Sequence, residues 1–171
     1  MNKLNPMAVS LLNNLVEVCR DGYSAYQEAM RCIKSAELKG YFNVVSQERL
    51  RFGQELLVEL FKSDGALGRH GLNTLERPLP WQVAEHRLHG QDDKFILREL
   101  ARLEDGSLKL YETARRKQWP AELHALLERQ CAEVMRVHDH MQAECAAALK
   151  RLSVTTANIA PTTRHTLIAH P

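Results

Sequence analysis

The stretch VVSQERLRF, residues 44–52, combines an apolar helical stripe with a carboxylate. Val45 and Phe52 are one heptad apart, so both are expected to face the same side of a helix. Glu48 lies between them, three residues after Val45 and four before Phe52. On this spacing Glu48 falls on the stripe that faces the core. Either the helix has a different register, or Glu48 serves in the core as a hydrogen-bonding partner or as a metal ligand.

The same periodicity extends over four long segments of the chain, in which apolar residues recur every three or four positions. The segments cover about residues 9–34, 36–62, 92–118 and 120–152. Ser35 is the expected N-cap of the second segment. Pro120 suits the first turn of the fourth, because its missing N–H costs nothing there. The pattern predicts an all-α chain with four helices.

The connections between these segments predict how the helices are ordered in space. Short links follow the first and third helices, which favours two antiparallel hairpins, whereas the link at 63–91 is long enough to run the length of the bundle. The second and third helices would then be parallel, as in ferritin-like bundles with one long crossover. The Thr-rich end of the chain lacks a helical period. We therefore expect a bundle at 1–152 and a disordered tail at 153–171.

Charge and composition exclude several classes of function. The formal net charge is +2 over 171 residues, so no strong field for nucleic acid or anionic membrane is expected. No apolar run approaches the roughly 18 residues of a membrane span, and the N-terminus lacks the apolar core of a signal peptide. The four cysteines stand singly, without a CxxC pair, which favours buried thiols in a reducing compartment. We expect a cytoplasmic protein that binds neither nucleic acid nor membrane.

Two further polar residues interrupt the apolar stripes at about the height of Glu48. They are Glu104 in the third helix and His138 in the fourth. Residue counts from the helix ends place all three near mid-bundle, with Tyr23 and Tyr26 of the first helix at the same height. Buried carboxylates need a partner or a cation, because an unpaired one costs several kcal/mol. The three residues predict either a hydrogen-bonded core network, which we favour, or a metal site of two carboxylates and an imidazole.

Four stretches of the sequence resemble a bacterial family of four-helix-bundle proteins. They are CRDGYSAYQEA (19–29), ELKGYFNVVSQERLRFGQEL (37–56), DDKFILRELARLEDGSLKLYETA (92–114) and ERQCAEVMRVHDHM (128–141). That family is a domain of unknown function grouped with the ferritin-like superfamily, and the resemblance spans about residues 11–149. It implies a ferritin-like four-helix bundle without implying an activity.

A complete di-iron centre of the ferritin type is not expected. Such centres take Glu-x-x-His from two helices and one Glu from each of the other two. Here Arg51 stands three residues after Glu48, and Met135 stands three residues before His138. The first helix offers Tyr23 at the level where a Glu is required. We therefore expect a non-catalytic stress or accessory protein. The alternative is a metal-binding protein that holds one iron or similar divalent ion through the three mid-bundle residues.

Apolar residues in the long connection need to be covered, either by the bundle or by another subunit. They are Leu72, Leu75, Leu79, Trp81 and Val83. We expect the bundle to cover most of them and a homodimer to cover the rest.

Overall fold

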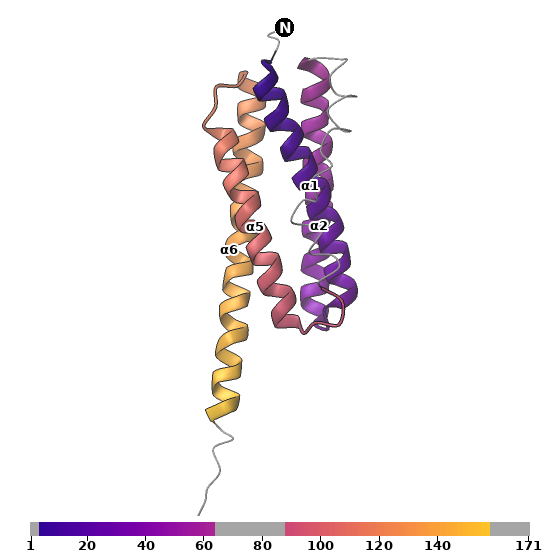
Figure 1. The fold of residues 1–171 in the computed structure, drawn as a ribbon, viewed down its shortest axis with the longest axis vertical. Coiled ribbons are helices and arrows are strands. Elements are labelled where there is room, and N and C mark those ends of the chain that lie inside the picture. Colours follow the sequence, from indigo (N-terminus) through magenta and orange to yellow (C-terminus); the bar gives the residue numbers. More distant parts are fainter. Residues whose placement is uncertain (1–3, 64–87, 158–171) are drawn as a thin grey trace, which may run out of the picture.

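The computed structural model describes residues 4–63 and 88–157. Within these ranges the chain forms four helices, which are α1 (Pro6–Cys32), α2 (Ala36–Ser63), α5 (Asp93–Arg115) and α6 (Ala121–Ala157) (Figure 1). The all-α four-helix bundle predicted from the periodicity is confirmed. Of these helices, none is both long and apolar enough to cross a membrane.

Polar side chains cap the starts of α1, α2 and α5. The Asn5 side chain accepts a hydrogen bond from the Ala8 N–H at 2.8 Å, and Asp92 accepts one from the Phe95 N–H at 2.8 Å. The predicted cap Ser35 accepts from the Leu38 N–H at 3.3 Å. Each cap satisfies one of the amide groups that the first helical turn leaves without a partner.

The helices form two antiparallel hairpins, α1 with α2 and α5 with α6 (Figure 1). Asp93, at the start of α5, joins the hairpins at one end of the bundle. Its carboxylate accepts hydrogen bonds from the N–H groups of Lys34 and Ser35, at 2.9 and 3.2 Å, in the turn between α1 and α2. Because α2 ends at the opposite end of the bundle, α2 and α5 are parallel, as predicted from the crossover. Residues 64–87 of the connection, which include the apolar residues predicted to need covering, lie outside the described residues.

Helix α6 is longer than predicted. It continues to Ala157, five residues past the expected helix end at about Leu152. The residues SVTTA at 153–157 disfavour helix by only tenths of a kcal/mol each. No glycine or proline occurs between the start of α6 and Pro161, so nothing in the sequence stops the helix at residue 152. The rest of the predicted tail, 158–171, lies outside the described residues.

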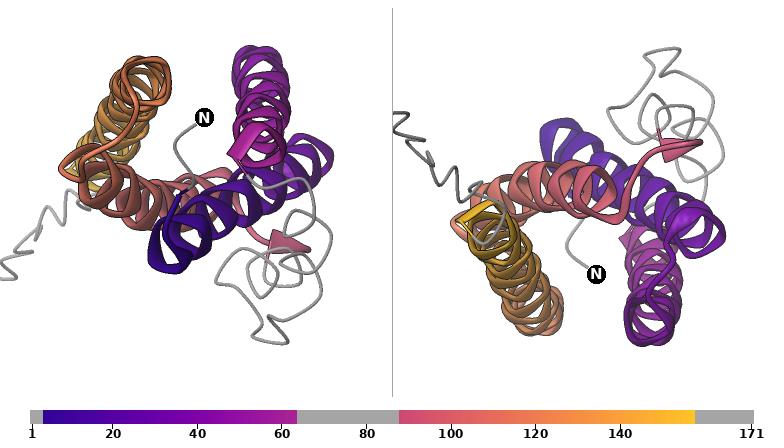
Figure 2. Two further views of the ribbon diagram at one scale, coloured as in Figure 1. Left: turned by 90° about the horizontal axis from the view of Figure 1, so that it is seen from above. Right: turned by 90° about the horizontal axis from the view of Figure 1, so that it is seen from below.

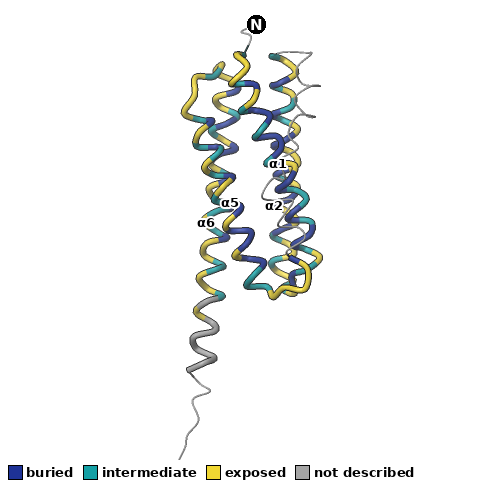
Figure 3. Tube along the Cα trace, in the orientation of Figure 1, coloured by how far each residue is buried: buried dark blue, intermediate teal, exposed yellow. Residues whose placement is uncertain are grey.

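Buried apolar side chains form two clusters, one toward each end of the bundle, and the buried positions line the inner side of the helices (Figure 3). On α2, Val45 belongs to one cluster and Phe52 to the other. The large side chain buried between them is that of Arg49, which is 1% exposed. Glu104 of α5 is also fully buried. A polar layer therefore separates two apolar ends of the core.

Seen from its ends, the helices follow one another in the order α6, α5, α1 and α2 (Figure 2). Helices α5 and α1 are therefore the inner pair of this row, and α6 and α2 are the outer pair. Long polar side chains join the outer pair, with Arg129 at 2.9 Å from Glu55 and Arg136 at 3.3 Å from Glu48. Beside the first of these ion pairs, α2 and α6 line an open groove of about 510 Å³ that includes Val58. The α2–α6 side is thus the least closely packed side of the bundle.

Three helical glycines differ in the room around them, which gives a testable contrast. A Cβ added at Gly40 or Gly106 meets no heavy atom within 4 Å, whereas one added at Gly53 lies 3.4 Å from the Cβ of Cys19. We expect Gly40→Ala and Gly106→Ala each to raise the free energy of unfolding by about 0.5–1 kcal/mol, because alanine favours helix. Gly53→Ala should gain less, since its methyl group would lie tightly against Cys19 of α1. Urea unfolding of the three variants decides this, and an equal gain at Gly53 would contradict it.

Candidate functional site

The buried polar layer begins at Arg49 on α2, not at Glu48. Arg49 lies four residues after Val45 and three before Phe52, so it satisfies the same heptad spacing as Glu48. Gly22 on α1 makes room for it, since a Cβ at that position would lie 3.4 Å from the Cγ of Arg49. The sequence-based assignment of Glu48 to the core stripe is therefore wrong by one position, or about 100° around the helix.

Glu104 on α5 is the partner of Arg49. Arg49 Nη2 lies 2.7 Å from Glu104 Oε2, and both side chains are almost fully buried. The Tyr26 hydroxyl of α1 donates a hydrogen bond to the other oxygen, Oε1, at 2.8 Å. Both oxygens of the carboxylate are thus engaged by groups from two other helices. The predicted tyrosine contribution comes from Tyr26, while Tyr23 is half-buried and makes no described contact with this layer.

A second row of hydrogen bonds connects all four helices nearby. The Tyr111 hydroxyl donates to Gln130 Oε1 at 3.0 Å, and its oxygen lies 3.1 Å from the Sγ of Cys19. With the hydroxyl proton used in this way, the Cys19 thiol is the donor to the tyrosine oxygen. Gln130 Nε2 donates in turn to Glu55 Oε2 at 2.8 Å. The row runs from α1 through α5 and α6 to α2.

Burial keeps the groups of this core in one protonation state near neutral pH. Burial and the nearby Glu104 raise the pKa of Tyr26 well above its ordinary value. Burial likewise raises the pKa of Tyr111, and it raises that of the Cys19 thiol to about 11. Burial alone would lower the pKa of Arg49, but the Glu104 carboxylate outweighs it and raises that pKa. The site consists of protonated hydroxyl and thiol groups, the charged guanidinium of Arg49, and a Glu104 carboxylate whose two oxygens are both bound. Such a set suits a structural network better than proton transfer.

Family comparison places the chain among known sequences. The model of the family described as Domain of unknown function (DUF2383) matches residues 7–118. The chain belongs to this family. The matched part of the DUF2383 protein spans α1, α2 and α5, so it contains Tyr26, Arg49 and Glu104 but ends before Gln130. No curated protein matches the sequence.

Glu48 and His138, the other two predicted site residues of this DUF2383 protein, lie at the edge of the bundle. Glu48 forms an ion pair with Arg136 of α6 at 3.3 Å. His138 Nδ1 lies 3.0 Å from Asp139, and its Nε2 lies 3.7 Å from Asp105. Among the described residues, neither forms a hydrogen bond or an ion pair with Glu104, so the core network has other members than predicted. Binding of a metal by Glu48, Glu104 and His138 stays a prediction.

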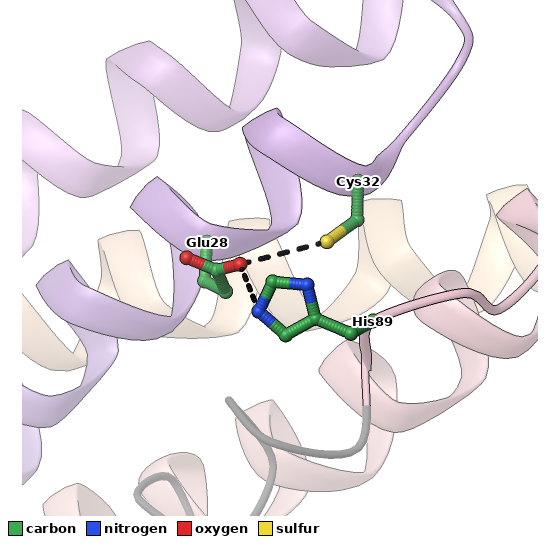
Figure 4. A group of neighbouring side chains, drawn as sticks. All are labelled: Glu28, Cys32 and His89. Carbon is green, nitrogen blue, oxygen red and sulfur yellow. Dashed lines mark hydrogen bonds and ion pairs between the residues drawn. The ribbon is translucent and has the colours of Figure 1, made fainter.

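Within the described part of the chain, ligand atoms suited to a metal ion come together elsewhere. Glu28, Cys32 and His89 each offer one such atom, and the three atoms lie within 4.8 Å of one another (Figure 4). This group was not predicted from the sequence. The spacing of Glu28 and Cys32 places them on one face of α1. His89 is remote in sequence, and no local pattern indicates that it lies beside them.

Proposed function

We propose that this DUF2383 protein is a non-catalytic accessory protein of the ferritin-like kind that acts by association, as a homodimer. The observation that carries the proposal is that the buried carboxylate at mid-bundle already has its partners. Arg49 supplies positive charge to Glu104 at 2.7 Å, and Tyr26 supplies a hydrogen bond at 2.8 Å. A guanidinium thus stands where a metal ion would neutralise the carboxylate. In this proposal the interior serves to hold the helices together, and function resides on the surface.

The outer face of α2 supports a role in association. Among the described residues, the exposed large apolar side chains on α2 are those of Val44, Leu50, Val58 and Phe61, which are 39–55% exposed. Val44 and Val58 are two heptads apart and therefore lie on one line along the helix. Leu50 and Phe61 are about three turns apart and lie on a second line, roughly 90° around the helix from the first. Apolar side chains gathered on one face in this way are typical of protein contact sites.

The charges beside these residues favour a second copy of the same chain as the partner. Glu37, Arg51 and Lys62 are exposed and place both signs along α2, so the face can pair with itself about a two-fold axis. The nearly even charge of the chain, +2, also gives little repulsion between copies. A two-fold dimer is the commonest symmetric assembly of soluble proteins.

A cytoplasmic location is part of the proposal. The cysteines Cys19, Cys32, Cys131 and Cys145 are all free thiols. Unpaired thiols are the usual state in a reducing compartment. The weak net charge supports the further expectation that nucleic acid is not a partner.

Sedimentation equilibrium of the full chain tests the association. We expect a dimer at micromolar concentration. Val58→Lys should raise its dissociation constant at least about tenfold, the effect of about 1.4 kcal/mol, because a charge then stands at the apolar face of both copies. Met7→Lys is the matched control, since Met7 is 77% exposed but lies on α1. A wild-type monomer at tens of micromolar, or an equal effect of Met7→Lys, would contradict the homodimer.

A further inference from the structure

Three side chains of different chemistry meet where the end of α1 faces the chain that leads into α5 (Figure 4). His89 Nε2 lies 2.8 Å from Glu28 Oε1, and Cys32 Sγ lies 3.6 Å from the same oxygen. The ligand atoms of all three residues lie within 4.8 Å of one another. In a tetrahedral zinc site, bonds of about 2.0–2.3 Å place the ligand atoms roughly 3.3–3.6 Å apart. The Glu28–Cys32 separation of 3.6 Å matches that arrangement, and small side-chain shifts would bring His89 to it as well.

Local structure holds each of these side chains in place. Glu28 and Cys32 are four residues apart on α1, so they point from the same face of the helix. His89 is held between Leu88, which is fully buried, and Gly90, whose φ of 72° turns the chain toward α5. Only glycine adopts such a φ readily. The imidazole is therefore directed at α1 by an anchor on one side and a turn on the other.

The second oxygen of Glu28 is bound separately. Arg31 Nη1 lies 2.8 Å from Glu28 Oε2, which leaves Oε1 facing Cys32 and His89. A hydrogen bond to the outer oxygen of a ligating carboxylate is a usual way to orient it toward a metal. The Arg31 side chain is largely exposed, so its charge is screened by solvent.

We propose that Glu28, Cys32 and His89 bind one divalent transition-metal ion of the zinc class, with a fourth position open to water. Thiolate and imidazole ligands favour zinc, iron, copper and nickel over magnesium and calcium. The carboxylate and the thiolate offset the two positive charges of the ion. The thiol proton leaves to solvent as the Cys32–metal bond forms. The ion can reach the site from the solvent beside His89, since that side chain is 70% exposed.

Cobalt(II) titration of the full chain tests the site directly. The protein is purified without a histidine tag and kept reduced with a non-thiol reductant. We expect one cobalt ion per chain, with the charge-transfer absorption of a cobalt–thiolate bond, and its displacement by zinc(II). Cys32→Ser should abolish that absorption, and His89→Ala and Glu28→Gln should each weaken binding at least about tenfold.

Matched controls distinguish this site from other ligands on the molecule. Cys145→Ser removes another partly buried thiol, and His124→Ala removes another exposed imidazole. Both should bind cobalt as the wild type does, and far-ultraviolet circular dichroism should show equal helix content in all variants. The proposal is overturned if the thiolate absorption persists in Cys32→Ser. It is equally overturned if binding is lost in His138→Ala but kept in His89→Ala, because the ion is then bound at His138.

Discussion

Arg49→Met is expected to lower the free energy of unfolding by about 3–5 kcal/mol, the usual cost of removing one partner of a buried ion pair. Methionine fills most of the space of the arginine stem, so the loss comes mainly from charge. In the wild type the Glu104 carboxylate is fully buried and lies 2.7 Å from the Arg49 guanidinium. In the variant it keeps the Tyr26 hydroxyl but has no cation. Chemical denaturation of the purified variant measures the loss.

An exposed ion pair between the same residue types provides the control. Arg136 contacts Glu48 at 3.3 Å and Glu133 at 2.7 Å with its side chain half exposed, so Arg136→Met should still cost no more than about 1 kcal/mol. The comparison separates the effect of burial from that of losing an arginine. Similar losses for the two variants would show that the Arg49–Glu104 pair is not buried in solution.

Replacing the whole polar layer by apolar side chains distinguishes two quantities. One is the net contribution of the Arg49–Glu104 pair to stability, and the other is the cost of removing only one of its partners. The triple variant Arg49→Met, Glu104→Leu and Tyr26→Phe leaves none of the three polar groups without a partner. Apolar replacement of a complete buried ion pair is often neutral or stabilising, so we expect this variant to recover most of the loss. If it is as unstable as Arg49→Met alone, the polar layer itself contributes net stability.

The apolar period of the sequence predicts the helices but does not determine their rotation to within one residue. Between Val45 and Phe52 the core position can be Glu48, at spacings of three and four, or Arg49, at spacings of four and three. The same ambiguity recurs on α6 between Val134 and Met141. There Val137 is fully buried and His138 lies beside it, partly exposed. Both predicted side chains are therefore displaced about 100° from the core.

The choice between these registers comes from the neighbouring helix. Gly22 of α1 leaves room for the stem of Arg49, which is a tertiary relation that the α2 sequence does not contain. Glu104, by contrast, is fully buried, in keeping with its place on the apolar stripe of α5. The Glu28–Cys32–His89 group is harder still to predict from the sequence, because the position of His89 depends on how a long connection returns to the bundle. Contacts between distant segments require the fold to be known first.

The stability of the protein is expected to fall steeply above pH 9. Burial raises the pKa of the Cys19 thiol from its ordinary value of 9.0 to about 11 in the folded state. Between these two values the unfolded chain releases the thiol proton and the folded chain retains it, so rising pH favours unfolding. The contribution is fully present below pH 9 and is lost by about pH 11. Two pKa units correspond to about 2–3 kcal/mol.

The tyrosines of the core act in the same direction at higher pH. Burial raises the pKa of both Tyr26 and Tyr111 above the ordinary value of 10.0, so each adds to the loss once the unfolded chain begins to ionise its tyrosines. Urea unfolding at intervals from about pH 8 to about pH 11 should show the slope beginning near pH 9 with the thiol and steepening above pH 10 with the phenols.

Cys19→Ser isolates the part of this loss that belongs to the thiol. Serine is nearly isosteric, can donate to the Tyr111 oxygen as the thiol does, and does not ionise in this range. The variant should lose about 1 kcal/mol or less at pH 8, the scale of one altered hydrogen bond, yet resist the change from pH 9 to pH 10 better than the wild type. Cys145→Ser is the control, because Cys145 is only partly buried and should leave most of the slope unchanged. Equal slopes in Cys19→Ser and the wild type would mean that the Cys19 thiol ionises as readily in the folded protein as in the unfolded chain, and hence that the row from Cys19 to Glu55 is open to solvent.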